Sequence, residues 1–167
     1  MFSLSVSAMT WLPGSDETED LCLHGHAAVI IGDELLEYDA TVSAAALYLL
    51  KSTREDHILG AGLQMLPCCG HFLIANEEKT RVEIVGCDSG VDFSVIHEKD
   101  DVRLTTGSGN SVRIPLSEYR AAVFAFTDEI ERFYRKSKPK KLPTDQFEKD
   151  GYLTFWAEWR SLREGVV

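Results

Sequence analysis

The sequence predicts an α+β fold in one domain spanning residues 1–167, with antiparallel strands packed against helices. Apolar and polar residues alternate over several short segments before residue 116, which is the period of a half-buried strand. Short runs of turn-forming residues separate these segments, so neighbouring strands should pair antiparallel. Longer segments carry apolar residues at helical spacing, which predicts helices with one buried face.

The first strands lie before residue 40. Apolar residues alternate with serines from Phe2 to Ala8, which predicts a half-buried strand. The segment from Leu21 to Ile31 reads as a second strand, and Gly32-Asp33 is a turn signal. Residues from Leu35 to Tyr38 then return as the other arm of a hairpin.

A first helix should follow, because Asp39 or Thr41 can accept hydrogen bonds from its free N–H groups. The helix should fade near Asp56-His57. Its apolar residues fall on one face: Val42, Ala45, Ala46, Leu49 and Leu50. Five short strands are expected next, at about 69–75, 80–86, 91–97, 101–106 and 111–115. The prediction is an antiparallel meander of about five to seven strands packed against the helices.

Two more helices are predicted near the C-terminus. A long helix should begin with Ser117 as its N-cap and end near Lys136. Residues 137–143 contain two prolines and several lysines, which predicts an exposed basic connector. A helix starting near Asp150 or Gly151 follows, and we expect its aromatic face to dock on the same domain. That face comprises Tyr152, Phe155, Trp156, Trp159 and Leu162.

The charge is unevenly distributed along the chain, whose formal net charge is −10. Residues 1–100 carry 5 basic and 17 acidic residues, whereas residues 101–167 carry 12 basic and 10 acidic residues. An excess of negative charge disfavours non-specific binding to nucleic acid, because the phosphate backbone repels it. It favours encounter with a basic protein partner. The candidate partner-binding residues form an acidic loop: Asp16, Glu17, Glu19 and Asp20.

A basic run lies near the end of the long helix and in the connector: Arg132, Arg135, Lys136, Lys138, Lys140 and Lys141. It lacks the interleaved aromatic residues that stack nucleic-acid bases. Basic residues in the last turn also complement the helix dipole. A third reading is that the run faces the acidic half of its own chain or of a second copy. The long helix also carries an apolar stripe, which with the aromatic tail leaves room for a homodimer. The stripe comprises Tyr119, Val123, Phe126, Ile130 and Phe133.

No segment approaches the ~18 consecutive apolar residues that cross a bilayer. The first twelve residues lack the basic residues of an export signal, so we expect a cytoplasmic protein with four reduced cysteines. Adjacent cysteines such as Cys68 and Cys69 would point to opposite faces of a strand, and a disulfide between them would be strained.

The best candidate for chemistry is a group of cysteines and histidines. In a strand, positions i, i+2 and i+4 share one face, and Cys-x-His recurs later in the chain. Thiolates and imidazoles are ligands that zinc selects. The predicted metal ligands are Cys22, His24, His26, Cys69 and His71. The alternative interpretation is that the cysteines are small buried hydrophobic residues and the histidines are hydrogen-bonded at the sheet edge.

Short motifs of nucleotide binding, serine hydrolysis and zinc proteolysis are absent from the sequence. The main hypothesis is therefore a non-catalytic protein that binds a protein partner through its acidic surface. In composition the chain resembles small acidic bacterial inhibitors, including immunity proteins that block basic nuclease toxins. The alternative is a zinc- or thiol-dependent protein that uses the Cys/His group. An enzyme with a site dispersed over several elements stays open, because such sites leave no local motif.

Overall fold

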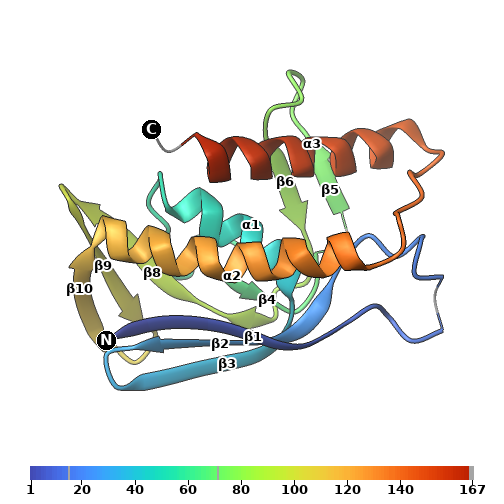
Figure 1. Ribbon diagram of the computed structural model, residues 1–167. Coiled ribbons are helices and arrows are strands. Elements are labelled where there is room, and N and C mark those ends of the chain that lie inside the picture. Colours follow the sequence, from blue (N-terminus) through green and yellow to red (C-terminus); the bar gives the residue numbers. More distant parts are fainter. Residues whose placement is uncertain (15, 71, 166–167) are drawn as a thin grey trace.

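Antiparallel sheets and three helices form the α+β fold that the sequence predicts (Figure 1). The structure is a computed structural model that describes residues 1–14, 16–70 and 72–165. Its elements, in chain order, are β1 Phe2–Thr10, β2 His24–Ile31, β3 Glu34–Thr41, α1 Val42–Ser52, β4 Leu66–Pro67, β5 Phe72–Ala75, β6 Val82–Val85, β7 Gly90–Val91, β8 Phe93–Glu98, β9 Asp101–Thr106, β10 Ser111–Pro115, α2 Leu116–Lys136 and α3 Gln146–Glu164.

The first sheet has the order β1-β2-β3 and contains the predicted N-terminal hairpin. Gly32 takes a φ of 68° in the turn between β2 and β3, a conformation that glycine adopts without steric cost. The second strand begins at His24, three residues later than predicted from Leu21. Cys22 therefore lies outside the strand, so the alternation that placed it on one face with His24 and His26 does not apply.

The later strands lie near the predicted positions but divide among three further sheets. Strands β8, β9 and β10 form a three-stranded sheet, whereas β5 pairs with β6 and β4 pairs with β7. The short β4–β7 pair joins segments that lie more than twenty residues apart in the sequence, at Leu66↔Val91 and Pro67↔Gly90. Local turn signals predict hairpins between neighbouring strands and carry no information about such a pair.

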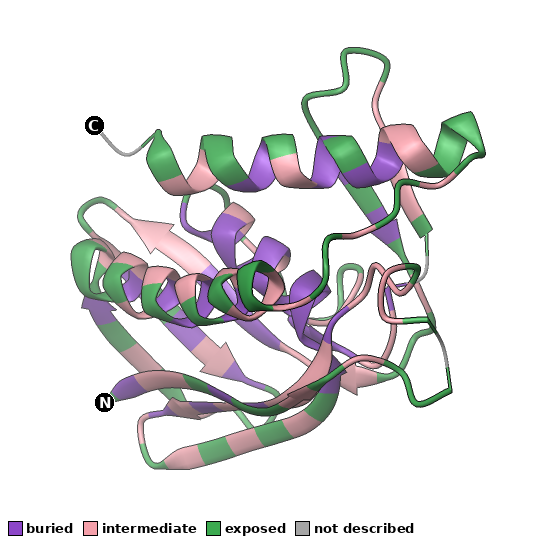
Figure 2. Ribbon diagram, turned by 45° about the vertical axis from the view of Figure 1, so that its right-hand side comes forward, coloured by how far each residue is buried: buried purple, intermediate pink, exposed green. Residues whose placement is uncertain are grey.

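Helix α1 lies at the centre of the molecule, between the sheets and the other two helices (Figures 1 and 2). Its residues are buried except for Tyr48 and Lys51, so the burial extends well beyond the single face that the periodicity predicts. The predicted side-chain cap is wrong, because Thr41 makes no cap hydrogen bond. Its Oγ1 instead donates to the Cys68 carbonyl, 3.2 Å away, and ties the start of α1 to the segment after β4.

Helix α2 buries four residues of the predicted stripe against α1 and β1, whereas the fifth, Phe133, is half-buried. The four are Tyr119, Val123, Phe126 and Ile130. Ser117 is not its N-cap, because the helix starts at Leu116 directly after Pro115. A proline at this position costs no hydrogen bond, because the first N–H groups of a helix have no partner within the helix.

Helix α3 starts at Gln146, earlier than predicted, because Asp145 caps it by accepting a hydrogen bond from the Glu148 N–H. Its aromatic face docks on the same chain, as predicted, with Trp159 fully buried. Gly151 lies inside the helix and against the backbone of β5. An ion pair between half-buried Lys51 and buried Glu158 also joins α1 to α3, with Nζ and Oε1 3.4 Å apart.

Candidate functional site

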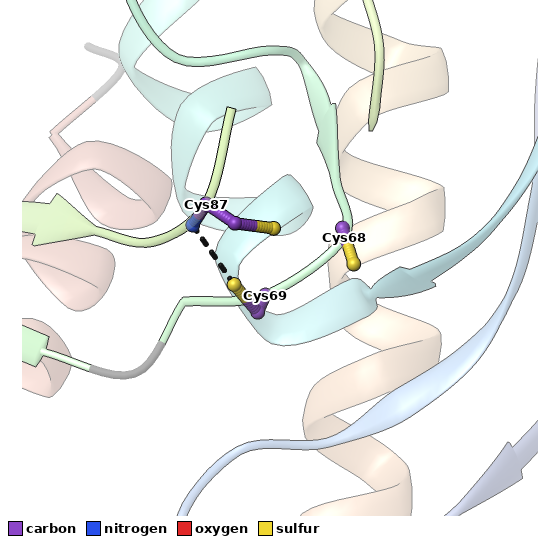
Figure 3. Close-up of side chains that lie close together, drawn as sticks. All are labelled: Cys68, Cys69 and Cys87. Carbon is purple, nitrogen blue, oxygen red and sulfur yellow. Dashed lines mark hydrogen bonds between the residues drawn. The ribbon is translucent and has the colours of Figure 1, made fainter. Parts of the chain in front are cut away.

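Three cysteines from two segments of the chain meet at one surface point, here called the thiol cluster (Cys68, Cys69 and Cys87; Figure 3). Their sulfur atoms all lie within 4.8 Å of one another. Among the described residues this is the one group of three or more Cys, His, Asp or Glu side chains gathered closely enough to hold a metal ion.

Backbone pairing between the two segments builds the thiol cluster. Beyond the β4–β7 pair, the Cys68 N–H donates to the Ser89 carbonyl at 2.9 Å. The Cys87 N–H donates to Cys69 Sγ, also at 2.9 Å. Gly86 permits this approach, because a Cβ there would lie 2.9 Å from the Cys69 carbonyl carbon and closer still to its oxygen. A side chain at position 86 would therefore push the two segments apart.

The sulfur of Cys87 is the acidic member of the cluster. Hydrogen bonds from the Cys69 thiol, the Ser89 N–H and the Cys68 thiol lower the pKa of Cys87 to about 7. Burial is the main influence that raises the pKa of Cys69. An exposed Cys87 beside two thiols therefore carries a substantial thiolate fraction at neutral pH.

Cys22 is close to this cluster, but its pKa is raised whereas that of Cys87 is lowered. Its Sγ donates to the Gly70 carbonyl at 3.4 Å, and the neighbouring Cys69 contributes to raising its pKa. Burial is the largest of the influences that raise the pKa of Cys22 to about 11. Cys22 is therefore a protonated thiol held by a backbone carbonyl.

The other predicted ligands are placed as follows. His26 lies on β2 beside two carboxylates of β3, with Nδ1 2.8 Å from Asp39 and Nε2 3.6 Å from Glu37. The hydrogen bond to Asp39 is the main influence that raises the pKa of His26. His24 lies two residues earlier on the same strand, and His71 falls outside the described residues.

Sequence reasoning missed Cys68 and Cys87 as cluster members. The segment holding Cys68 and Cys69 lies between β4 and β5 and is not a strand, so the rule of opposite faces does not separate them. Cys87 lies in a connector after β6. The local signal near it is Gly86, since glycine often marks a close backbone approach.

The acidic loop of residues 16–20 contacts the basic connector of its own chain, which is one of the readings that the sequence left open. The Lys138 N–H donates to the Glu17 carboxylate at 3.0 Å, and Lys140 Nζ donates to the Glu17 carbonyl. Lys141 Nζ lies 3.2 Å from the Glu19 carboxylate. Asp16 and Asp20 accept hydrogen bonds within the loop region itself.

Aromatic packing holds the connector in the same place. Lys140 Nζ lies 3.1 Å from the centre of the Trp11 ring, and Trp11 Nε1 donates to Ser137 Oγ. Trp11 also packs edge-on against Tyr134 of α2. The fold thus pairs part of the acidic loop with part of the basic connector of the same chain.

In the described part of the chain, no helix is long and apolar enough to cross a membrane. Comparison with known proteins gives no assignment: no family model, no curated protein and no solved structure matches this chain.

Proposed function

We propose that the thiol cluster is a zinc-binding site and that the protein works as a zinc-dependent protein. The observation that carries this proposal is the gathering of three cysteine sulfurs within 4.8 Å at the surface. Soft thiolate ligands select Zn²⁺ and Cu⁺ over hard cations, and zinc was the metal expected from the sequence.

The size of the cluster fits a zinc ion. Zinc–sulfur bonds of about 2.3 Å in a tetrahedron place the sulfurs about 3.8 Å apart. The described sulfurs would therefore move together by about 1 Å at most, within the range of small side-chain rotations. The exposed position of Cys87 leaves solvent access to a fourth ligand position.

The protonation state of the cluster also favours metal binding. Zinc binds thiolates, so each thiol must lose its proton as the metal enters. Cys87, with a pKa of about 7, loses its proton near neutral pH and provides a first ligand. Metal binding should then release the protons of Cys68 and Cys69.

The test loads the reduced full-length chain with zinc chloride and measures bound zinc by elemental analysis after dialysis. We expect one zinc per chain and a higher melting temperature, because a ligand that binds only the folded state stabilises it. Cys69→Ser and Cys87→Ser should each lose the bound zinc. Cys22→Ser is the matched control, since a serine hydroxyl can still donate to the Gly70 carbonyl. Zinc that fails to bind stoichiometrically, or is lost equally in the control, rules out the proposal.

A second candidate is a redox switch, favoured by the low pKa of exposed Cys87 beside two thiols. The Cys87 thiolate would attack hydrogen peroxide, break the O–O bond and form a sulfenic acid, releasing hydroxide. The Cys69 thiol would then displace water and form a disulfide. Peroxide treatment of the metal-free protein should remove two hydrogens per chain by mass, and bound zinc should slow that reaction. An unchanged mass argues against the switch and leaves zinc binding untouched.

The acidic-surface hypothesis, including the inhibitor or immunity-type role, stays a prediction. Its candidate residues Glu17 and Glu19 already contact lysines of the same chain, which reduces the charge they offer to a partner. A basic protein partner should associate more slowly as salt concentration rises. Binding that is indifferent to salt would contradict this hypothesis.

A further inference from the structure

A cavity of about 500 Å³ lies between helices α2 and α3. Its lining residues lie much later in the sequence than the thiol cluster. Four arginines line it, two from each helix: Arg132, Arg135, Arg160 and Arg163. Within each helix the two arginines are three residues apart, so they share one face. The chain as a whole carries a charge of −10, so this concentration of guanidinium groups is a local exception.

Two of these arginines already have carboxylate partners. Arg163 forms a two-pronged pair with Asp128, at 2.7 and 2.8 Å, and Arg135 lies 2.6 Å from Glu131. Arg132 and Arg160 are exposed, and neither forms an ion pair with any described residue. Glu164 also lines the cavity and acts electrostatically on Arg163, so the three carboxylates of the wall face four guanidinium groups.

We propose that the α2–α3 cavity binds a small phosphate-bearing molecule. Guanidinium groups recognise phosphate through two parallel N–H···O bonds, and Arg132 and Arg160 approach the cavity from opposite helices with free donors. The negative charge of the rest of the molecule disfavours a long polyanion such as nucleic acid and leaves room for a small ligand.

The experiment titrates the full-length protein with inorganic phosphate and with ADP, by calorimetry at low ionic strength. We expect saturable binding of one molecule per chain. Arg132→Gln and Arg160→Gln should each weaken binding by about tenfold, the loss of roughly one charged contact. Lys136→Gln is the matched control, because it removes one charge from α2 at a residue that does not line the cavity. The control should bind like the parent protein.

Binding that never saturates, or that falls equally in Lys136→Gln and Arg160→Gln, overturns the proposal, because general electrostatic attraction would then explain it. These outcomes do not depend on zinc or on the thiol cluster.

Discussion

Replacing Gly151 with alanine sets two opposing effects against each other in helix α3. Alanine is favoured over glycine by about 1 kcal/mol inside a helix, so propensity alone predicts a more stable protein. Gly151 is buried, however, and a Cβ there would lie 2.8 Å from the Leu73 carbonyl carbon and closer still to its oxygen. The added methyl group would therefore meet the backbone of strand β5, which cannot rotate away.

The size of the steric effect follows from these distances. Carbon atoms pack at about 3.5–4.0 Å, so α3 would have to move away from β5 by roughly 1 Å. Such a movement would loosen the packing of Phe155 and Trp159, which lie on the same helix and are buried. Overpacking of a core typically costs about 1–3 kcal/mol, and here backbone rather than a flexible side chain is the obstacle. A backbone obstacle places the cost at the upper end of this range, about 3 kcal/mol, so Gly151→Ala should lower the free energy of unfolding by about 2 kcal/mol after the propensity gain of about 1 kcal/mol.

Urea unfolding followed by tryptophan fluorescence measures this change, because Trp156 and Trp159 both lie on α3. The matched control is Ala157→Gly, at an exposed position of the same helix. It should lose about 1 kcal/mol from propensity alone. If Gly151→Ala is as stable as the parent or more stable, the helix does not lie as close to β5 as the structure places it, and the reasoning fails.

Three further predictions concern ionisable groups. Glu158→Gln should lower the free energy of unfolding by about 2 kcal/mol in urea, because it leaves the half-buried Lys51 ammonium with the Val82 carbonyl but without its carboxylate; an effect near zero would contradict this. The rate of Cys87 alkylation by iodoacetamide should reach half its maximum near pH 7, and Cys87→Ser should abolish the fast reaction; a midpoint above pH 8 would contradict the lowered pKa. Burial raises the pKa of Asp92, but hydrogen bonds from His57 and two backbone N–H groups outweigh it and hold the pKa below its ordinary value of 3.8. The stability that Asp92 contributes is therefore complete above that value and is lost as the pH falls through the lowered pKa. Asp92→Asn should flatten the acid side of a stability profile, and an unchanged profile would show that other carboxylates set it.

The helices and strands could be predicted where their side-chain pattern is local. The stripe from Tyr119 to Ile130 repeats at helical spacing and is buried as expected. The hairpin across Gly32-Asp33 follows from turn residues between two apolar runs. Helix ends were less predictable, because Asp145 rather than a residue near Gly151 provides the first cap of α3. Glycine inside a helix resembles a helix boundary in sequence, and only its contact with β5 explains its position.

The sequence predicted a group of metal-ligating side chains but not which residues the fold brings together. Cysteines as soft ligands follow from residue chemistry, and Cys69, one of the predicted ligands, lies in the thiol cluster beside two cysteines outside the predicted set. Cys87 joins it because β4 pairs with β7, a contact between segments that no local turn connects. The α2–α3 cavity has the same origin, since Arg132 and Arg160 meet only when α3 packs beside α2.

The distribution of charge separates most clearly what the sequence determines from what the tertiary structure decides. The sequence alone shows that the first hundred residues are acidic and that a basic run lies near residue 140, because the net charge of a segment is the sum of its residues' charges. Whether the two attract a partner or each other depends on distance, and Coulomb attraction falls off with both separation and solvent screening. The fold brings Lys141 to 3.2 Å from Glu19 and the three sulfurs of the thiol cluster to within 4.8 Å. Local periodicity is a property of neighbours in sequence, whereas these contacts arise from the packing of segments that lie far apart in the sequence.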